Sequence, residues 1–170
     1  MTYLEQLIPI IKENYTKAAL VDYSPSNSVP CNAYTFGQMY QKICALKTML
    51  SRMGVVAGDH VALCGSNSAH WMISYLSVAS IRAVNVCLMH SQTPEMLASQ
   101  IDFSDAKVLF VDLGIKYPKR VKDNKYSTSK DILDKIVLDH EVVPLVLEYR
   151  TLAKLYTNYA VGLKEEVRDD

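Results

Sequence analysis

The fold is decided by the stretch from Gly54 to Asp112, which reads GVVAGDHVALCGSNSAHWMISYLSVASIRAVNVCLMHSQTPEMLASQIDFSDAKVLFVD. Three short apolar runs in it predict buried strands, at His60–Cys64, Val84–Leu88 and Lys107–Val111. The segments between these runs predict helices, the first over 67–82 and the second after a Thr93 cap. Parallel strands joined by crossover helices have this alternation, and helices then cover the sheet faces. The sequence therefore predicts an α/β fold with a mainly parallel sheet and a βαβαβ unit over 60–111.

The region before this stretch predicts two capped helices and a short ribbon. Thr2 and Glu5 form the first capping-box pattern and Thr35 and Gln38 the second, with Gly54 ending the second helix. Between the helices, Ala18–Tyr23 and Asn32–Tyr34 predict two strands separated by a polar turn at 24–28. That connection is too short for a crossover, so we expect a short antiparallel ribbon near the N-terminus.

Bulk composition excludes several function classes. The 170 residues fit one domain, and 18 Lys+Arg balance 18 Asp+Glu, so we expect no nucleic-acid partner and no attraction to anionic membranes. Residues 71–89 are apolar, but Arg82 near their middle makes membrane insertion costly, and we expect no membrane span. The N-terminus lacks the pattern of a signal peptide. The four cysteines have no metal-ligand spacing, and we expect them to be buried free thiols of a cytoplasmic protein.

The pattern weakens after Asp112. Residues 113–130 hold six Lys or Arg and one acidic residue, which we interpret as a solvated loop. A short helix is predicted over 130–138, a strand over 142–147 and a final helical turn or two over 151–159. Pro144 either argues against that strand or places it at a sheet edge.

No stretch predicts a complete active site. The turn Cys64–Ser68 joins a strand to a helix start, where open α/β sheets bind anions, but without a second glycine or a cation a tight turn with a helix cap is favoured. Ser66 lacks the pattern of a nucleophile elbow. The remaining polar candidates are scattered, and we expect none of them to be catalytic, cofactor-binding or metal-binding: His60, His70, His90, His140, Asp102 and Asp105.

Several short motifs occur in the order found in one enzyme superfamily. They are Tyr34-Thr35-Phe36-Gly37-Gln38, Gly54-Val55, Gly58-Asp59-His60-Val61-Ala62-Leu63, Asn67-Ser68-Ala69-His70-Trp71, Thr93-Pro94-Glu95 and Asp105-Ala106-Lys107-Val108-Leu109-Phe110-Val111. Together they resemble the N-terminal subdomain of the adenylate-forming enzymes, the AMP-binding acyl-CoA synthetase superfamily, over 18–112. The stretch Cys64–Trp71 and the turn Leu88-Met89-His90 look most like the long-chain fatty acid–CoA ligases. Residues 113–150 match the family loosely.

The resemblance implies an N-terminal fragment of an ATP-dependent fatty acid–CoA ligase. Such a ligase turns a carboxylate and ATP into an acyl-adenylate and then a thioester with coenzyme A. It implies ATP, Mg and coenzyme A for the parent enzyme, none bound by this fragment, and the remaining subdomains as partners. Residues 1–112 would be the α/β subdomain and 113–170 its continuation, ending before the phosphate loop. The fragment is expected to be inactive alone.

A stand-alone, non-catalytic α/β binding or interaction module is the alternative, since a chain of this length can fold independently. The fragment interpretation adds one expectation about the surface. A face that meets missing subdomains would leave an apolar patch exposed, and a homodimer could cover it.

Overall fold

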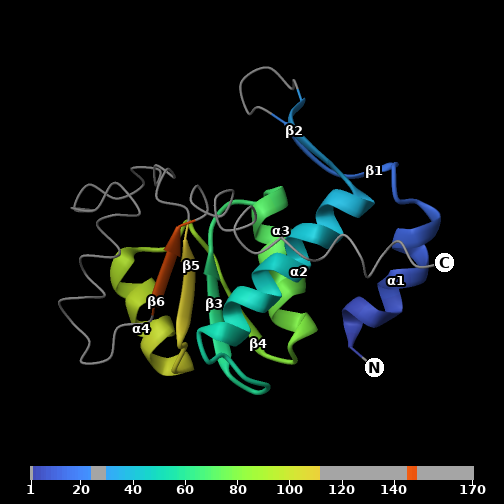
Figure 1. Ribbon diagram of the computed structural model, residues 1–170. Coiled ribbons are helices and arrows are strands. Elements are labelled where there is room, and N and C mark those ends of the chain that lie inside the picture. The colour runs from blue at the N-terminus through green and yellow to red at the C-terminus, as the bar shows by residue number, and fades with distance from the viewer. Residues whose placement is uncertain (1, 24–29, 112–144, 149–170) are drawn as a thin grey trace.

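The computed structural model describes residues 2–23, 30–111 and 145–148 (Figure 1). In chain order the elements are α1 (Tyr3–Glu13), β1 (Ala18–Tyr23), β2 (Pro30–Thr35), α2 (Phe36–Arg52), β3 (His60–Cys64), α3 (Ala69–Ser80), β4 (Val84–Leu88), α4 (Pro94–Ser104), β5 (Val108–Val111) and β6 (Leu145–Glu148). The predicted helices over 130–138 and 151–159 lie outside the described residues, as does His140.

The main sheet has four strands in the order β4-β3-β5-β6, all paired in parallel. The β3–α3–β4–α4–β5 path confirms the predicted βαβαβ unit. The strand predicted over 142–147 is confirmed for its second half, since β6 begins at Leu145, directly after Pro144. Within the described residues, β6 lies at the edge of the sheet beyond β5, as the sequence predicted.

The predicted antiparallel ribbon is also confirmed. Strands β1 and β2 pair with each other alone, and the ribbon extends away from the parallel sheet (Figure 1). Most of its side chains are exposed or half-buried, and its register shifts at two places. Its outer part therefore depends on local pairing, while its inner end is held by the helices beside it.

Both capping boxes form as predicted. The Thr35 hydroxyl accepts from Gln38 N at 3.2 Å, while the Gln38 side chain accepts from Thr35 N at 2.9 Å. Thr2 and Glu5 make the same reciprocal pair at the start of α1. The helix α2 ends where Gly54 adopts a φ of +84°, a conformation that favours glycine.

The helix α3 is shorter at both ends than the 67–82 prediction. It begins at Ala69 because Ser68 is the N-cap, with extended dihedrals and its hydroxyl accepting from Trp71 N. It ends at Ser80, and Arg82 then takes a positive φ of 60° in the turn to β4. The sequence placed the cap two residues too early and missed the left-handed turn.

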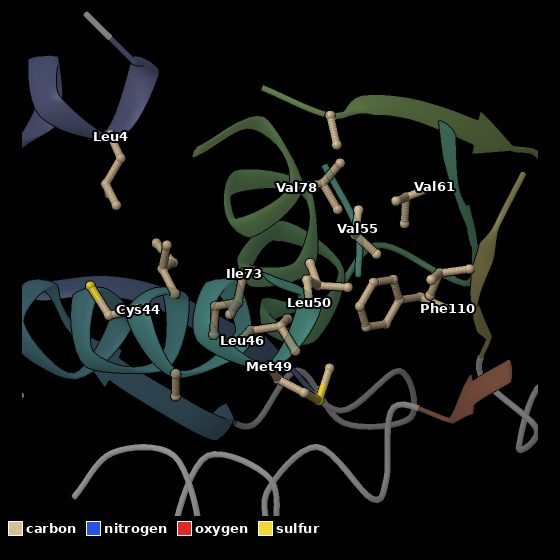
Figure 2. Packing of buried hydrophobic residues seen from close by; sticks show 14 of the residues in the cluster. Leu4, Cys44, Leu46, Met49, Leu50, Val55, Val61, Ile73, Val78 and Phe110 are labelled. Atoms are coloured by element: carbon tan, nitrogen blue, oxygen red, sulfur yellow. The ribbon is translucent and has the colours of Figure 1, made fainter. Parts of the chain in front are cut away.

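Two hydrophobic cores lie on opposite faces of the parallel sheet. Successive strand residues point to opposite faces of the sheet. Val61 and Phe110 therefore join α1, α2 and α3 in one core (Figure 2), while Leu109 joins α4 in the other. Helix α2 contributes one continuous stripe of buried residues to the first core: Gly37, Met39, Ile43, Cys44, Ala45, Leu46, Met49 and Leu50. The predicted cover of helices on both faces is thus present.

Candidate functional site

The turn Cys64–Ser68 follows the carboxyl end of β3. The sequence allowed two interpretations of it, an anion site or a tight turn with a helix cap. Cys64 ends the strand, and Ser68 caps α3, accepting from Trp71 N at 3.2 Å through its hydroxyl and from Met72 N at 3.1 Å through its carbonyl. These bonds satisfy two of the amide donors at the start of the helix. The turn therefore acts as a helix cap.

A carboxylate from the ribbon occupies the same helix start. Asp22 Oδ1, on β1, accepts from Ala69 N at 2.8 Å across 47 residues of sequence. A negative charge at a helix N-terminus is stabilised by the helix dipole and by the free N–H groups. The protein's own carboxylate thus lies where an external anion would bind, and its charge opposes a phosphate there. This geometry favours the interpretation of the turn as a cap.

Three further side chains gather beside Asp22, and we call them with it the Tyr34 cluster: Asp22, Tyr34, Lys42 and His70. The Lys42 ammonium lies 5.1 Å from the centroid of the Tyr34 ring, and the Tyr34 and His70 rings lie 6.3 Å apart in a tilted arrangement. The cation over the ring and the capping carboxylate tie the ribbon to α2 and α3.

Partial burial changes the acidities within the Tyr34 cluster. Desolvation raises the pKa of Tyr34, and the nearby charge of Asp22 raises it further. Desolvation also lowers the pKa of Lys42. Sequence reasoning missed this group because its members come from β1, β2, α2 and α3. One local sign existed, since aspartate is disfavoured in strands and Asp22 interrupts an otherwise apolar one.

A second polar group stands at the amino ends of the strands, away from the edge where such sheets bind ligands. Asp59 pairs with Lys107 at 2.6 Å and accepts from Val56 N at 2.8 Å. The hydrogen bond from Lys107, together with the one from Val56, lowers the pKa of Asp59. His60 Nδ1 lies 2.5 Å from the Ser104 carbonyl oxygen. These contacts join β3 to β5 and α4, which is a structural role.

The other candidate residues are not brought together. His90 follows β4 in a turn, Asp102 is exposed on α4, and Asp105 caps that helix in the left-handed conformation. Within the described residues, no group of three His, Cys, Asp or Glu side chains could hold a metal ion.

The cysteine prediction is half wrong. Cys44 and Cys64 are buried, whereas Cys31 and Cys87 are exposed. Cys31 lies on the ribbon, and Cys87 lies on β4, which has one neighbouring strand in the described sheet. A sequence cannot show that an apolar strand stands at an edge. Partial burial nevertheless raises the pKa of the Cys87 thiol, which keeps it protonated at neutral pH.

Comparison with known proteins gives one family and two kinds of relatives. The model of the family described as AMP-binding enzyme matches residues 11–168. The acetyl-coenzyme A synthetase of Dictyostelium discoideum is 23% identical over 144 residues, covering 85% of this chain and 20% of that protein. DNA polymerase I of Bacillus subtilis is 38% identical over 63 residues, covering 37% of this chain and 7% of that protein. Further DNA polymerase I sequences match over 60 to 65 residues.

Solved structures agree with the fold. The acetoacetyl-CoA synthetase from Streptomyces lividans has a TM-score of 0.71 at 18% identity, over 89% of this chain and 25% of that protein. The likeness covers the α/β arrangement described above. This chain spans a small part of each relative's length. No helix among the described residues is both long and apolar enough to cross a membrane.

Proposed function

This chain belongs to the family of AMP-binding enzymes, and from that premise we propose that it forms the N-terminal part of an acyl-CoA ligase. The observation that carries the proposal is the family match over residues 11–168 on a chain whose βαβαβ unit bears the family's ordered motifs. The role proposed for residues 1–112 is that of a scaffold subdomain, and the rest of the ligase would supply the chemistry. A cytoplasmic location remains a prediction from the cysteine spacing.

The described residues do not fit ATP and Mg. The Asp22 carboxylate already accepts from Ala69 N at the start of α3, and no group of three His, Cys, Asp or Glu side chains among the described residues could hold a metal ion. We therefore assign no step of the reaction to these residues and expect the chain to be inactive alone. In the parent enzyme, residues outside this chain would hold ATP, Mg and coenzyme A.

We propose a long-chain fatty acid as the parent substrate. The support is the resemblance of Cys64–Trp71 and Leu88-Met89-His90 to the long-chain branch. The relatives are named for smaller acids: acetate in the Dictyostelium protein and acetoacetate in the Streptomyces protein. We identify no residue of this chain that determines specificity for the acid, so the proposal is tested on the parent enzyme.

The test has two arms. In the first, pyrophosphate release is measured for the purified chain with ATP, Mg, coenzyme A and either palmitate or acetate, and we expect none. In the second, the coding sequence after Asp170 is determined and the longer protein is assayed in the same way. We expect a Ser/Thr/Gly-rich phosphate loop ending in lysine and a higher rate with palmitate than with acetate. A stop codon directly after Asp170 would refute the fragment proposal, and preference for acetate would refute the substrate.

The DNA polymerase I relatives support a second candidate, a composite chain. Their matches span 60 to 65 residues, and the region after Val111 holds 59 residues. The adenylate-forming motifs lie within 18–112, and residues 113–150 match that family loosely. We therefore propose that the polymerase-like stretch falls mainly on 112–170. The 144-residue ligase match necessarily extends past Val111 as well, so the two candidates compete for the same residues.

The coding sequence separates these candidates. A composite chain predicts that reading on past Asp170 gives further DNA polymerase I sequence without a phosphate loop. It also predicts that the complete chain binds a primer–template DNA in a salt-sensitive way, and that the K119E/R120E variant in the basic stretch binds less well. A phosphate loop after Asp170, or the absence of DNA binding at low salt, would refute the composite chain.

A further inference from the structure

Within the described residues, strand β4 presents an open edge that lacks the usual features that block strand pairing. In the described sheet it pairs with β3 alone, and its register with β3 is continuous over all five residues. Its sequence Val-Asn-Val-Cys-Leu contains no charge, proline or glycine. Natural proteins block such edges with lysine, proline or a bulge, because an open edge pairs with other strands. None of these devices occurs within β4.

The hydrogen-bonding groups on the open side can be assigned. Val84 N donates to Asp59 O, on the β3 side. Backbone groups of successive strand residues alternate between the two sides, so the N–H and C=O groups of Asn85 and Cys87 point away from β3. These four groups are what a further strand would pair with.

We propose that β4 is the self-association edge of this protein, and that its partner is the β4 strand of a second copy, paired antiparallel about a twofold axis. The register that uses both outward residues places Asn85 opposite Cys87 of the other copy and Val86 opposite Val86. It overlaps the whole strand, Val84 facing Leu88, and joins two four-stranded sheets into one of eight.

Charge and flanking surface favour a second copy as the occupant. The chain carries equal numbers of acidic and basic residues, so two copies approach without net repulsion. Beside the edge, the Asn85 side chain donates to the Tyr75 carbonyl at 3.1 Å, which places that turn of α3 against β4. Tyr75 and Met72, one helical turn apart, are both exposed large apolar side chains. Stable interfaces bury about 1,200–2,000 Å² in total, which a five-residue strand pair does not reach by itself. Tyr75 and Met72 add apolar area beside the strand.

Sedimentation of the complete chain tests the association. We expect the mass to rise from monomer to dimer with a dissociation constant in the micromolar range, on the order of 1–100 μM. The Cys87→Lys variant places a charge on the edge and should raise that constant at least about tenfold. Thr16→Lys adds the same charge at an exposed turn after α1 and should leave it unchanged. A monomer at every concentration, or equal effects of the two lysines, would overturn the proposal.

Cross-linking tests the register. Facing residues of a non-hydrogen-bonded antiparallel pair have Cα atoms about 4.5 Å apart, within the range of a disulfide. In a background where Cys31 and Cys87 are serine, Val86→Cys should therefore form a covalent dimer under mild oxidation. Val84→Cys, on the same face of the same strand, should not, because it faces Leu88. Stronger linking by Val84→Cys than by Val86→Cys would refute this register.

Discussion

The carboxylate of Asp22 makes the longest-range polar contact at the start of α3, and its removal gives a graded prediction. Asp22→Asn keeps an oxygen that can accept from Ala69 N but removes the charge. Asp22→Ala removes both. At a partly buried helix start, the charge contributes about 0.3–1 kcal/mol and a capping acceptor about 0.5–2 kcal/mol. We therefore expect Asp22→Asn to lower the free energy of unfolding by about 0.5 kcal/mol and Asp22→Ala by about 1–2 kcal/mol.

Urea unfolding of the complete chain, followed by far-UV circular dichroism and tryptophan fluorescence, measures these changes. Trp71 lies in the first turn of α3 and reports on that helix end. Glu13→Gln is the control, since it also removes one negative charge but at the exposed last residue of α1. It should cost less than Asp22→Asn because a negative charge near a helix C-terminus is not stabilising. Equal stabilities of wild type and Asp22→Ala would refute the capping role.

Three further predictions concern residues away from the Tyr34 cluster. The hydrogen bond from Lys107 lowers the pKa of Asp59 in the folded protein. The ionised Asp59 therefore stabilises the fold at neutral pH, and this stabilisation is lost as the pH falls through the folded-state pKa. In urea titrations, Asp59→Asn should lose less stability than wild type between pH 7 and pH 3. Gly37→Ala would place a Cβ 2.4 Å from the Tyr15 ring, so the ring must move, and we expect a loss of about 1–3 kcal/mol in unfolding free energy, largely restored by Tyr15→Ala in the double variant. Gly54→Ala meets no neighbouring atom but must adopt a φ of +84°, and thermal unfolding should show a loss of about 1–2 kcal/mol that no second-site truncation restores.

Local sequence rules predicted the elements whose causes are local. Thr2 with Glu5 and Thr35 with Gln38 fixed two helix starts, because a capping box satisfies backbone donors within four residues. Gly54 marked the end of α2 for an equally local reason, since glycine adopts the positive φ of that turn without strain. The apolar runs located three strands, but only β3 and β5 are buried, whereas most of β4 is exposed or half-buried. The right-handed crossovers between parallel strands then left one arrangement of helices.

Contacts between distant segments were not predicted, because they depend on which elements become neighbours. Asp22 and Ala69 are 47 residues apart, and neither residue type indicates the other as its hydrogen-bond partner. Cys87 is exposed because β4 lies at the edge of the described sheet. The apolar pattern of a single strand does not predict its position in the strand order. The same limit applies to the Tyr34 cluster, whose four residues come from four elements.

Within the described residues, the Tyr34 cluster explains why the usual anion position of this fold is not open to a ligand. At the carboxyl end of β3, the fold's usual anion position is filled by Asp22, which anchors the ribbon to α3. The charge that would attract a nucleotide is thus replaced by one that repels it, and the helix start is used for stability. Among the exposed large apolar side chains, Val84 lies on β4, and Met72 and Tyr75 lie on the adjoining turn of α3. We expect Asp22→Ala to alter stability while Cys87→Lys alters association, each without the other effect.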